Sequence, residues 1–222
     1  MLLSKRQILR AGAAGAALLA TPAILAQAKT VYEGQREAAS EDDFFGPLRE
    51  DNGYKFRTTR MEYIPPSFRR QLVKYKHNEP DGSIVIDSSN HFLYITFEND
   101  TALRYGVGVG REGFQWFGRA QVGRKAEWPR WIPPDEMLLR RPELPKMMVG
   151  GPENPLGPRS LYLYRDGKDL IYRIHGTTEP WSIGNNVSSG CIRLLNEDII
   201  DLYRRIPVGT RVLVLKHLGD PV

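Results

Sequence analysis

The chain has 222 residues, with 31 lysines and arginines against 26 acidic residues and a net charge of +5 at neutral pH. Three of the bases, Lys5, Arg6 and Arg10, fall in the first 28 residues, which contain no acid. The other 194 residues carry 28 bases and 26 acids, a charge of only +2. So weak a surplus argues against a nucleic-acid partner, and the length suits one domain with a modest extension.

The first 28 residues have the three-part layout of a secretory signal peptide. A basic start is followed by the apolar run Ala11–Leu25 and by Ala26-Gln27-Ala28, which looks like a cleavage site. An apolar run of about 15 residues falls short of the roughly 20 that span a bilayer. We therefore predict export, and Ser4–Arg10 is similar to a twin-arginine signal with Lys5 in the first arginine position. An uncleaved N-terminal anchor helix is the alternative interpretation.

Residues 29–80 are predicted to form an N-terminal extension that is partly disordered. The part from Lys29 to Gly53 is polar and acidic, with few apolar residues beyond Phe44 and Phe45. The part from Tyr54 to His77 mixes aromatic and basic residues, and we expect it to lie along the main domain. That domain is predicted to cover residues 81–217.

From residue 81 onward the pattern favours β-strands, because short apolar runs alternate with turn residues. The predicted strands and hairpins are Ile84–Ile86, Phe92–Phe97 with Thr101–Val109, Leu161–Arg165 with Leu170–Ile174, and Arg211–Lys216. Gly106, Gly108 and Gly110 predict close approach of backbones and not nucleotide binding, because no helix signal follows them. Glu112–Gly157 is dense in Pro, Gly and Trp, and we expect an irregular segment of the kind that forms lids or binding surfaces.

The only convincing helix signal is Asn196–Ile206. Asn196 is suited to an N-cap, and Glu197 and Asp198 place negative charge in the first turn. One face is apolar, made by Ile199, Leu202, Tyr203 and Ile206. The elements together predict a mostly β domain with one late helix.

Cys191 is the single cysteine, so an exported chain can form no internal disulfide. A lone thiol in an oxidising compartment is open to oxidation and asks for a reason. A buried inert thiol is one reason and a nucleophile is the other. A nucleophilic cysteine needs a base, and His175 stands 16 positions earlier at the exit of a predicted strand. The other histidines, His77, His91 and His217, lack such neighbours, and with only one cysteine they argue against a metal site.

Small residues precede the thiol, in the run Ser188-Ser189-Gly190. They would let an acyl carbonyl approach the backbone, where the N–H groups of Gly190 and Cys191 are candidate oxyanion donors. Gly176, directly after His175, lets the connection between base and thiol fold back. Arg193 would lie on the side of Cys191 in an extended segment, where it could fix a carboxylate or form a surface salt bridge.

These residues resemble the catalytic motif of the L,D-transpeptidase (YkuD-like) family. That motif has a histidine followed at some distance by Ser/Thr-His-Gly-Cys, an apolar residue, and Asn or Arg. Here it reads His175, then Ser188-Ser189-Gly190-Cys191-Ile192-Arg193. The resemblance covers residues 81–216; it includes Trp131–Pro134, Gly150–Gly157 with Arg159, and Asn196–Thr210.

One position departs from the family, since Ser189 stands where the family has its second histidine. The upstream histidine, matched by His175, is the family's catalytic base. The departure therefore bears on the tuning of the site, and an inactive copy is the alternative.

The resemblance implies a β-sandwich-like fold of mixed sheets with one helix packed against them, and an enzyme of the periplasm. Its implied substrate is the peptidoglycan stem peptide, which Cys191 attacks at the third residue to form a thioester. An amine then resolves the thioester, giving a 3–3 cross-link or anchoring an envelope protein. Neither a metal nor an organic cofactor is implied. An L,D-carboxypeptidase, in which water is the acceptor, and a noncatalytic wall-binding domain are the other hypotheses.

Overall fold

The structure is a computed structural model that describes residues 39–110, 116–188 and 190–215, so the predicted signal peptide and Ser189 lie outside the described residues. The strands are β1 (Phe45–Asp51), β2 (Tyr54–Thr59), β3 (Gln71–Lys74), β4 (Ile84–Asp87), β5 (Phe92–Phe97), β6 (Thr101–Gly106), β7 (Val109–Gly110), β8 (Gly118–Glu127), β9 (Arg159–Arg165), β10 (Lys168–His175), β11 (Asn186–Ser188), β12 (Ile192–Arg193) and β13 (Arg211–Val214). The α-helices in these ranges are α3 (Asp135–Arg140) and α4 (Asn196–Arg205). Single 3-10 turns are η2 (Glu41–Phe44), η3 (Met61–Tyr63), η4 (Pro66–Phe68) and η5 (Pro180–Ser182).

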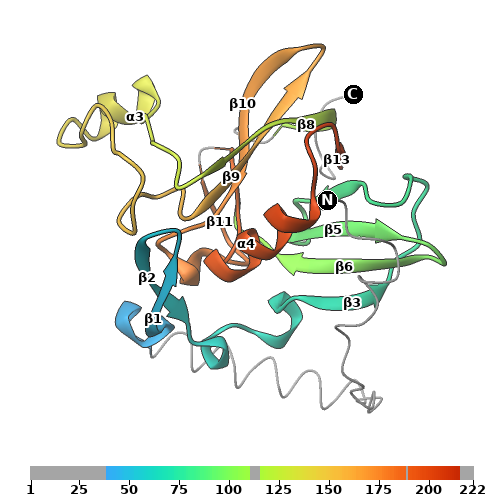
Figure 1. Cartoon of the computed structure of the whole chain (residues 1–222), viewed down its shortest axis with the longest axis horizontal. Helices are drawn as coiled ribbons and strands as arrows, with labels where there is room; N and C mark the ends of the chain where they lie inside the picture. Colours follow the sequence, from blue (N-terminus) through green and yellow to red (C-terminus); the bar gives the residue numbers. More distant parts are fainter. Residues whose placement is uncertain (1–38, 111–115, 189, 216–222) are drawn as a thin grey trace. The chain divides into compact units, whose positions relative to one another are not determined.

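Nine of these strands form one mixed sheet, in the order β12-β10-β9-β8-β13-β4-β5-β6-β3. The pairs β10–β12 and β13–β4 are parallel, and the other neighbours are antiparallel. The β9–β10 hairpin and the β5–β6 hairpin run in crossed directions, with α4 beside them (Figure 1). The prediction of a mostly β, sandwich-like domain of mixed sheets is confirmed.

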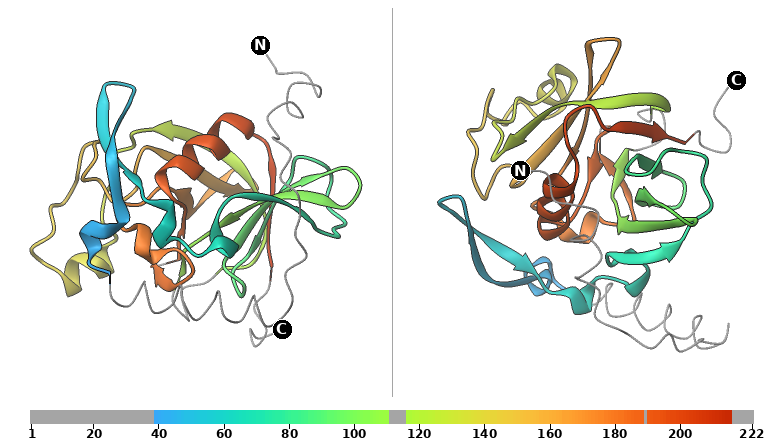
Figure 2. Two further views of the ribbon diagram at one scale, coloured as in Figure 1. Left: turned by 90° about the horizontal axis from the view of Figure 1, so that it is seen from below. Right: turned by 45° about the vertical axis from the view of Figure 1, so that its right-hand side comes forward.

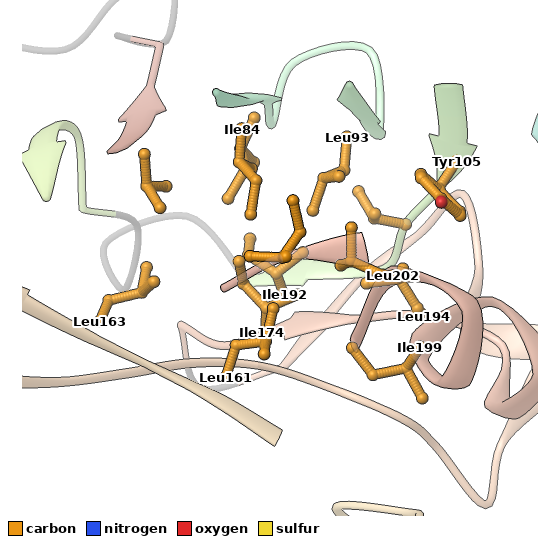
Figure 3. Close-up of a cluster of buried hydrophobic side chains, with 14 of the residues drawn as sticks. Ile84, Leu93, Tyr105, Leu161, Leu163, Ile174, Ile192, Leu194, Ile199 and Leu202 are labelled. Carbon is orange, nitrogen blue, oxygen red and sulfur yellow. The ribbon is translucent and has the colours of Figure 1, made fainter. Parts of the chain in front are cut away.

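The main core lies between the two ends of this sheet and is closed by α4. Ile84, Leu93 and Tyr105 come from the β4–β6 part and face Leu161 and Ile174 of the β9–β10 part (Figure 3). Helix α4 adds its apolar face, which consists of Ile199, Leu202 and the following Ile206. All of these side chains are buried, so the hydrophobic effect fixes which face of each strand points inward.

Two of the predicted hairpin turns are present with the backbone that their residues favour. Asn99 and Asp100 have φ of 60° and 50°, and Asp166 and Gly167 have φ of 52° and 75°. Because Arg165 pairs with Lys168, Asp166 and Gly167 are the two central positions of a primed turn, which matches the twist of the flanking strands. Asn99 and Asp100 belong to a three-residue loop between Phe97 and Thr101. Gly106 also allows the predicted close approach, because a Cβ there would lie 2.4 Å from the Phe68 carbonyl oxygen.

Part of the segment predicted to be irregular is regular. Residues 118–127 form β8, a ten-residue strand inside the large sheet, and residues 135–140 form α3. The sequence hides β8 because only Val122 is buried and the register shifts between Val122 and Arg124. A bulge of this kind interrupts the alternation on which strand prediction depends.

Helix α4 begins differently from the prediction. Asn196 is its first residue, Leu195 occupies the N-cap position, and no side chain caps the helix there. The Asn196 side chain points elsewhere and accepts a hydrogen bond from the Thr177 backbone N–H at 2.9 Å. The acidic first turn and basic last turn are as predicted.

The N-terminal extension contains a β-hairpin, β1–β2, between residues 45 and 59. Its turn is Asn52-Gly53, with φ of 49° and 82°, and the Asn52 side chain donates a hydrogen bond to Glu127 at the end of β8; the hairpin is the blue arm in Figure 2. The base of the hairpin is tied to α4, because Glu197 accepts hydrogen bonds from the Thr59 N–H and hydroxyl at 2.7 and 3.1 Å. Further along the extension, β3 pairs with β6 at the edge of the large sheet.

A buried ion pair fastens the same hairpin to the sheet. Both Arg159 Nη atoms donate to the Asp51 carboxylate, at 2.7 and 2.9 Å, and the Trp128 Nε1–H adds a third hydrogen bond at 2.9 Å. The two charged side chains are only 5% and 7% exposed. Burial alone would raise the pKa of Asp51, but the bonds from Arg159 outweigh it and hold that pKa below its usual range.

Removing one partner of this pair should cost far more than removing an exposed one. Asp51→Ala leaves Arg159 buried without its carboxylate, and we expect about 3–5 kcal/mol off the free energy of unfolding. The matched control is Glu62→Ala, which removes the exposed partner of Arg60 and should leave the free energy of unfolding nearly unchanged. Urea denaturation measures both, and equal small losses would contradict the role of the Asp51 pair.

Candidate active site

His175 ends β10, in the middle of three paired strands. It stands beside Ser160 of β9 and, in the parallel pair, beside Arg193 of β12. The preceding residue, Ile174, points into the core, so alternation places the His175 side chain on the opposite face of the sheet. His175 is nevertheless buried, with only 5% of the residue exposed.

One hydrogen bond fixes the protonation state of the ring. His175 Nδ1 lies 2.6 Å from the carbonyl oxygen of Gly176. A carbonyl oxygen can only accept, so Nδ1 carries the hydrogen. In a neutral imidazole Nε2 then holds the lone pair and is the atom that can take a proton.

Gly176 has no side chain, and the close packing around it holds its carbonyl in place. A Cβ at Gly176 would lie 2.4 Å from Asn196 Oδ1 and 2.9 Å from Pro158 Cδ. The same Asn196 oxygen accepts the Thr177 N–H, so the start of α4 secures both residues that follow His175. The Asn196 side chain therefore contacts Gly176 and Thr177 and does not cap α4.

Cys191 lies directly before β12, at the edge of the large sheet. Ile192 pairs with Ile174 and points into the core, so Cys191 and Arg193, which flank Ile192, lie on the face that carries His175. Continuing the register by one residue places Cys191 beside Arg173, whose backbone hydrogen-bonds to the thiol and lowers its pKa. The register therefore places the predicted nucleophile, directly before β12, and the predicted base, at the end of β10, at neighbouring positions of two adjacent strands, and their catalytic roles stay predictions.

Burial and two arginines set the charge states of the pair. Burial, aided by the charges of Arg193 and Arg173, lowers the pKa of His175 to about 3, against a weaker raising effect of the Gly176 bond. Burial raises the pKa of Cys191 despite the same two cations. Both groups are therefore neutral at pH 7, the cysteine as a thiol and the histidine as an imidazole in its base form.

Arg193 is engaged in an ion pair with Glu179, on the loop that joins His175 to Cys191. Its backbone is fixed as well, by two hydrogen bonds with Gly108 at 2.8 and 2.9 Å. The ion pair is one of the two interpretations that the sequence left open for Arg193, and its predicted role toward a substrate carboxylate stays a prediction. The Glu179 side chain is 47% exposed.

Gly190 has φ of 113°, a conformation that side chains disfavour. It also lines a mainly apolar pocket with Trp116, Tyr172 and Ile192. The backbone of Ser188 belongs to β11, which pairs with β7. The predicted roles of Ser188 and Gly190 toward a substrate stay predictions, as does that of Ser189, which lies outside the described residues.

Three residues of the site were missed from the sequence. Arg173 stands two positions before His175, so alternation along a strand was a usable signal for it. Asn196 and Ser160 gave no such signal, because strand pairing and packing bring them to His175. Ser160 is fully buried, and its hydroxyl has no hydrogen-bond partner among the residues that the structure describes.

Other kinds of site find little support in the described ranges. They contain no group of three or more His, Cys, Asp or Glu side chains that could hold a metal ion. None of their helices has the length and apolar character needed to cross a membrane.

Comparison with known proteins places this site in a family. Residues 81–214 match the model of the L,D-transpeptidase catalytic domain, YkuD. The chain is 35% identical over 175 residues to the probable L,D-transpeptidase ErfK/SrfK of Escherichia coli K12, covering 72% of this chain and 54% of that protein. It is 34% identical over 150 residues to the probable L,D-transpeptidase YbiS of the same strain, covering 64% and 46%. The chain belongs to the L,D-transpeptidase catalytic-domain family, and it spans about half the length of these curated relatives.

The two solved structures described next superpose on this chain with TM-scores below 0.5. One, described as a probable carnitine operon oxidoreductase caia from Brucella melitensis, is 46% identical and covers 70% of this chain and 99% of its own, with a TM-score of 0.47. An L,D-transpeptidase from Mycobacterium smegmatis is 18% identical and covers 81% and 80%, with a TM-score of 0.46. The family assignment rests on the sequence matches.

The charge states predict how the thiol reacts. Because the pKa of Cys191 is raised above its ordinary value of 9.0, alkylation by iodoacetamide should climb through pH 9 without levelling near neutrality. His175→Ala should slow the reaction at least tenfold at pH 7, where the imidazole assists proton removal, a tenfold change being about 1.4 kcal/mol on the barrier. The two proteins should converge at high pH, where hydroxide forms the thiolate.

A matched control is His77→Ala, since the ring nitrogens of His77 contact the carbonyl oxygens of Glu79 and Phe97 at 2.9 and 3.1 Å, away from the thiol. It should leave alkylation unchanged. An unaltered rate at pH 7 in His175→Ala would show that His175 is a structural histidine.

Proposed function

We propose that the protein is an exported, cysteine-dependent L,D-transpeptidase of the periplasm that acts on peptidoglycan stem peptides. The observation that carries the proposal is the hydrogen bond between His175 Nδ1 and the Gly176 carbonyl. It leaves Nε2 as a base on the face of the sheet that carries the only thiol of the chain. Family membership supplies the substrate class, and the basic start of the sequence supplies the export signal.

The first half of the reaction makes a thioester. The Cys191 thiol gives its proton to His175 Nε2 as sulfur attacks the carbonyl carbon of the third, diaminopimelate residue of the stem. The backbone N–H groups of Gly190 and Cys191 stabilise the oxyanion. When the tetrahedral intermediate collapses, the imidazolium returns the proton to the departing nitrogen and the terminal D-amino acid leaves.

The second half of the reaction reverses these steps, with a different amine attacking the thioester. Imidazole takes a proton from the incoming amine, which attacks the thioester carbonyl and expels the thiol. A diaminopimelate amine gives a 3–3 cross-link, and an amine of an envelope protein anchors that protein. Arg193 and Arg173 favour the reacting thiolate, because both cations lower the pKa of Cys191. No step requires a metal or an organic cofactor.

Mass analysis of muropeptides tests the proposal. Incubation of the purified full chain with tetrapeptide-containing peptidoglycan should give 3–3 cross-linked products, and intact mass should show an acyl-enzyme. Cys191→Ala should abolish both while the melting temperature stays close to wild type, because the change removes little volume. Turnover by Cys191→Ala would exclude the thioester route, and accumulation of free tripeptide alone would indicate an L,D-carboxypeptidase.

Ser189, which stands where the family has its second histidine, is tested by a separate variant. We expect wild type to be active and Ser189→His to change the rate less than tenfold, about 1.4 kcal/mol on the barrier. The reason is that His175, Gly190, Cys191 and Arg193 are all present. An acyl-enzyme that forms only in Ser189→His would mark the natural site as inactive and favour a wall-binding role.

A further inference from the structure

A row of side chains crosses the sheet next to the nucleophile. Arg124 of β8 pairs with Tyr162 of β9, and Tyr162 pairs with Arg173 of β10, which stands beside Cys191. Directly paired residues point to the same face, so Arg124, Tyr162 and Arg173 lie on the face that carries His175. Continuing the β10–β12 register by one residue places Cys191 beside Arg173. Strands β8, β9 and β10 lie side by side along this row (Figure 1).

Two guanidinium groups gather on one aromatic ring in this row. The Arg124 guanidinium carbon lies 3.6 Å from the Tyr162 ring centroid and that of Arg173 lies 4.4 Å from it. The two cations are therefore no more than about 8 Å apart, a distance at which like charges repel across a partly buried surface. Tyr162 is only 7% exposed, so the ring serves as a platform that holds both cations in place.

The arginines near Cys191 differ in whether a carboxylate forms an ion pair with them. Arg173 forms a bidentate pair with Asp169, at 2.6 and 2.9 Å, and its side chain is 17% exposed. Arg193, on the other side of Cys191, is paired with Glu179. Arg124 is exposed, and no carboxylate among the described residues forms an ion pair with it. The N–H donors of the Arg124 guanidinium are therefore available to a ligand.

We propose that Arg124, stacked on Tyr162, binds a carboxylate of the stem peptide while a carbonyl of the same peptide lies at Cys191. The inference rests on the proposed function and names the substrate feature that the site reads. A planar guanidinium held on a ring is pre-organised for bidentate contact with a carboxylate. Arg193, with its own acidic partner, is left to act on the thiol and the imidazole.

The spacing defines which carboxylate fits. Neighbouring strands are about 4.8 Å apart, so the Tyr162 platform, two strands from Cys191, places the guanidinium roughly 10 Å from the thiol. An extended peptide advances about 3.3–3.6 Å per residue. The carboxylate that Arg124 binds therefore lies roughly 10 Å from the carbonyl that Cys191 attacks, a span that two residues of the stem and a carboxyl-bearing side chain can cover.

Binding to a catalytically silent protein tests the proposal separately from turnover. The full-length Cys191→Ala variant, with and without Arg124→Gln, is titrated with a synthetic stem tetrapeptide and with analogues in which each carboxylate in turn is a carboxamide. Arg124→Gln should weaken binding of the parent peptide about tenfold, as expected for one charge-assisted contact. For one analogue alone, replacing the carboxylate with a carboxamide should weaken binding to the Cys191→Ala protein by the same tenfold factor. Adding Arg124→Gln should weaken the binding of that analogue no further.

Arg124→Lys and Arg49→Gln complete the series. Arg124→Lys keeps the charge and should recover part of the affinity, whereas Arg49→Gln removes an equal charge from the exposed edge of the N-terminal hairpin and should change nothing. If Arg124→Gln weakens every peptide equally, or none, Arg124 does not bind a stem carboxylate. If the binding pattern holds but the active protein yields no cross-link or acyl-enzyme, the proposed reaction fails and the carboxylate site stands.

In the active protein the same change should appear in one kinetic constant. Arg124→Gln should raise KM for the parent peptide about tenfold and leave kcat within a factor of two, because the contact is equal in the ground state and the transition state. The rate of iodoacetamide alkylation should be unaltered. A fall in kcat with unchanged KM would place Arg124 in the chemical step and contradict an anchoring role.

Discussion

The site depends on the contact between the His175 ring and the carbonyl of the next residue, Gly176. That contact decides which ring nitrogen is basic, and it exists because Gly176 has no side chain. A Cβ there would strike Asn196, whose oxygen at the start of α4 also holds the Thr177 N–H. The base is thus positioned by the register of β10 on one side and by the first residue of α4 on the other. In the proposed reaction, a base that is buried and oriented in advance needs no rearrangement to take the proton of the thiol.

Residues outside the family domain contribute to the same arrangement. The matched domain begins at residue 81, yet the segment between His175 and Cys191 packs against residues 44–68. Phe44 and Phe45 contact the ring of Trp181 edge-on, with centroids 5.9 and 6.0 Å apart, and the Phe68 ring fills the space beside Gly184. Hydrogen bonds to Glu197 and the buried Asp51 pair hold the hairpin in this place. The extension therefore supports the loop that carries Glu179, the counter-ion of Arg193.

Local signals predicted the parts of the structure that local chemistry determines. The Asp166-Gly167 turn and helix α4 both follow from residues close together in the sequence. The β1–β2 hairpin was missed, although Asn52-Gly53 was a usable turn signal, because its strands bury few side chains and gain their stability from Trp128, Arg159 and α4. The roles of Asn196 and Arg124 could not be predicted, since one depends on packing at a helix start and the other on register across three strands. Propensity describes a segment by itself, whereas these contacts are tertiary.

The central claim is that His175 waits as a neutral base with its hydrogen on Nδ1, and nitrogen NMR of the imidazole tests it most directly. In protein labelled with ¹⁵N at histidine, His175 should show one protonated and one unprotonated nitrogen from pH 8 down to pH 5. The protonated one should be Nδ1, because the pKa is lowered to about 3 and the Gly176 carbonyl accepts that hydrogen. His175→Ala identifies the signal by its loss. A ring that titrates near pH 6.5, or one that carries its hydrogen on Nε2 at neutral pH, would contradict the account.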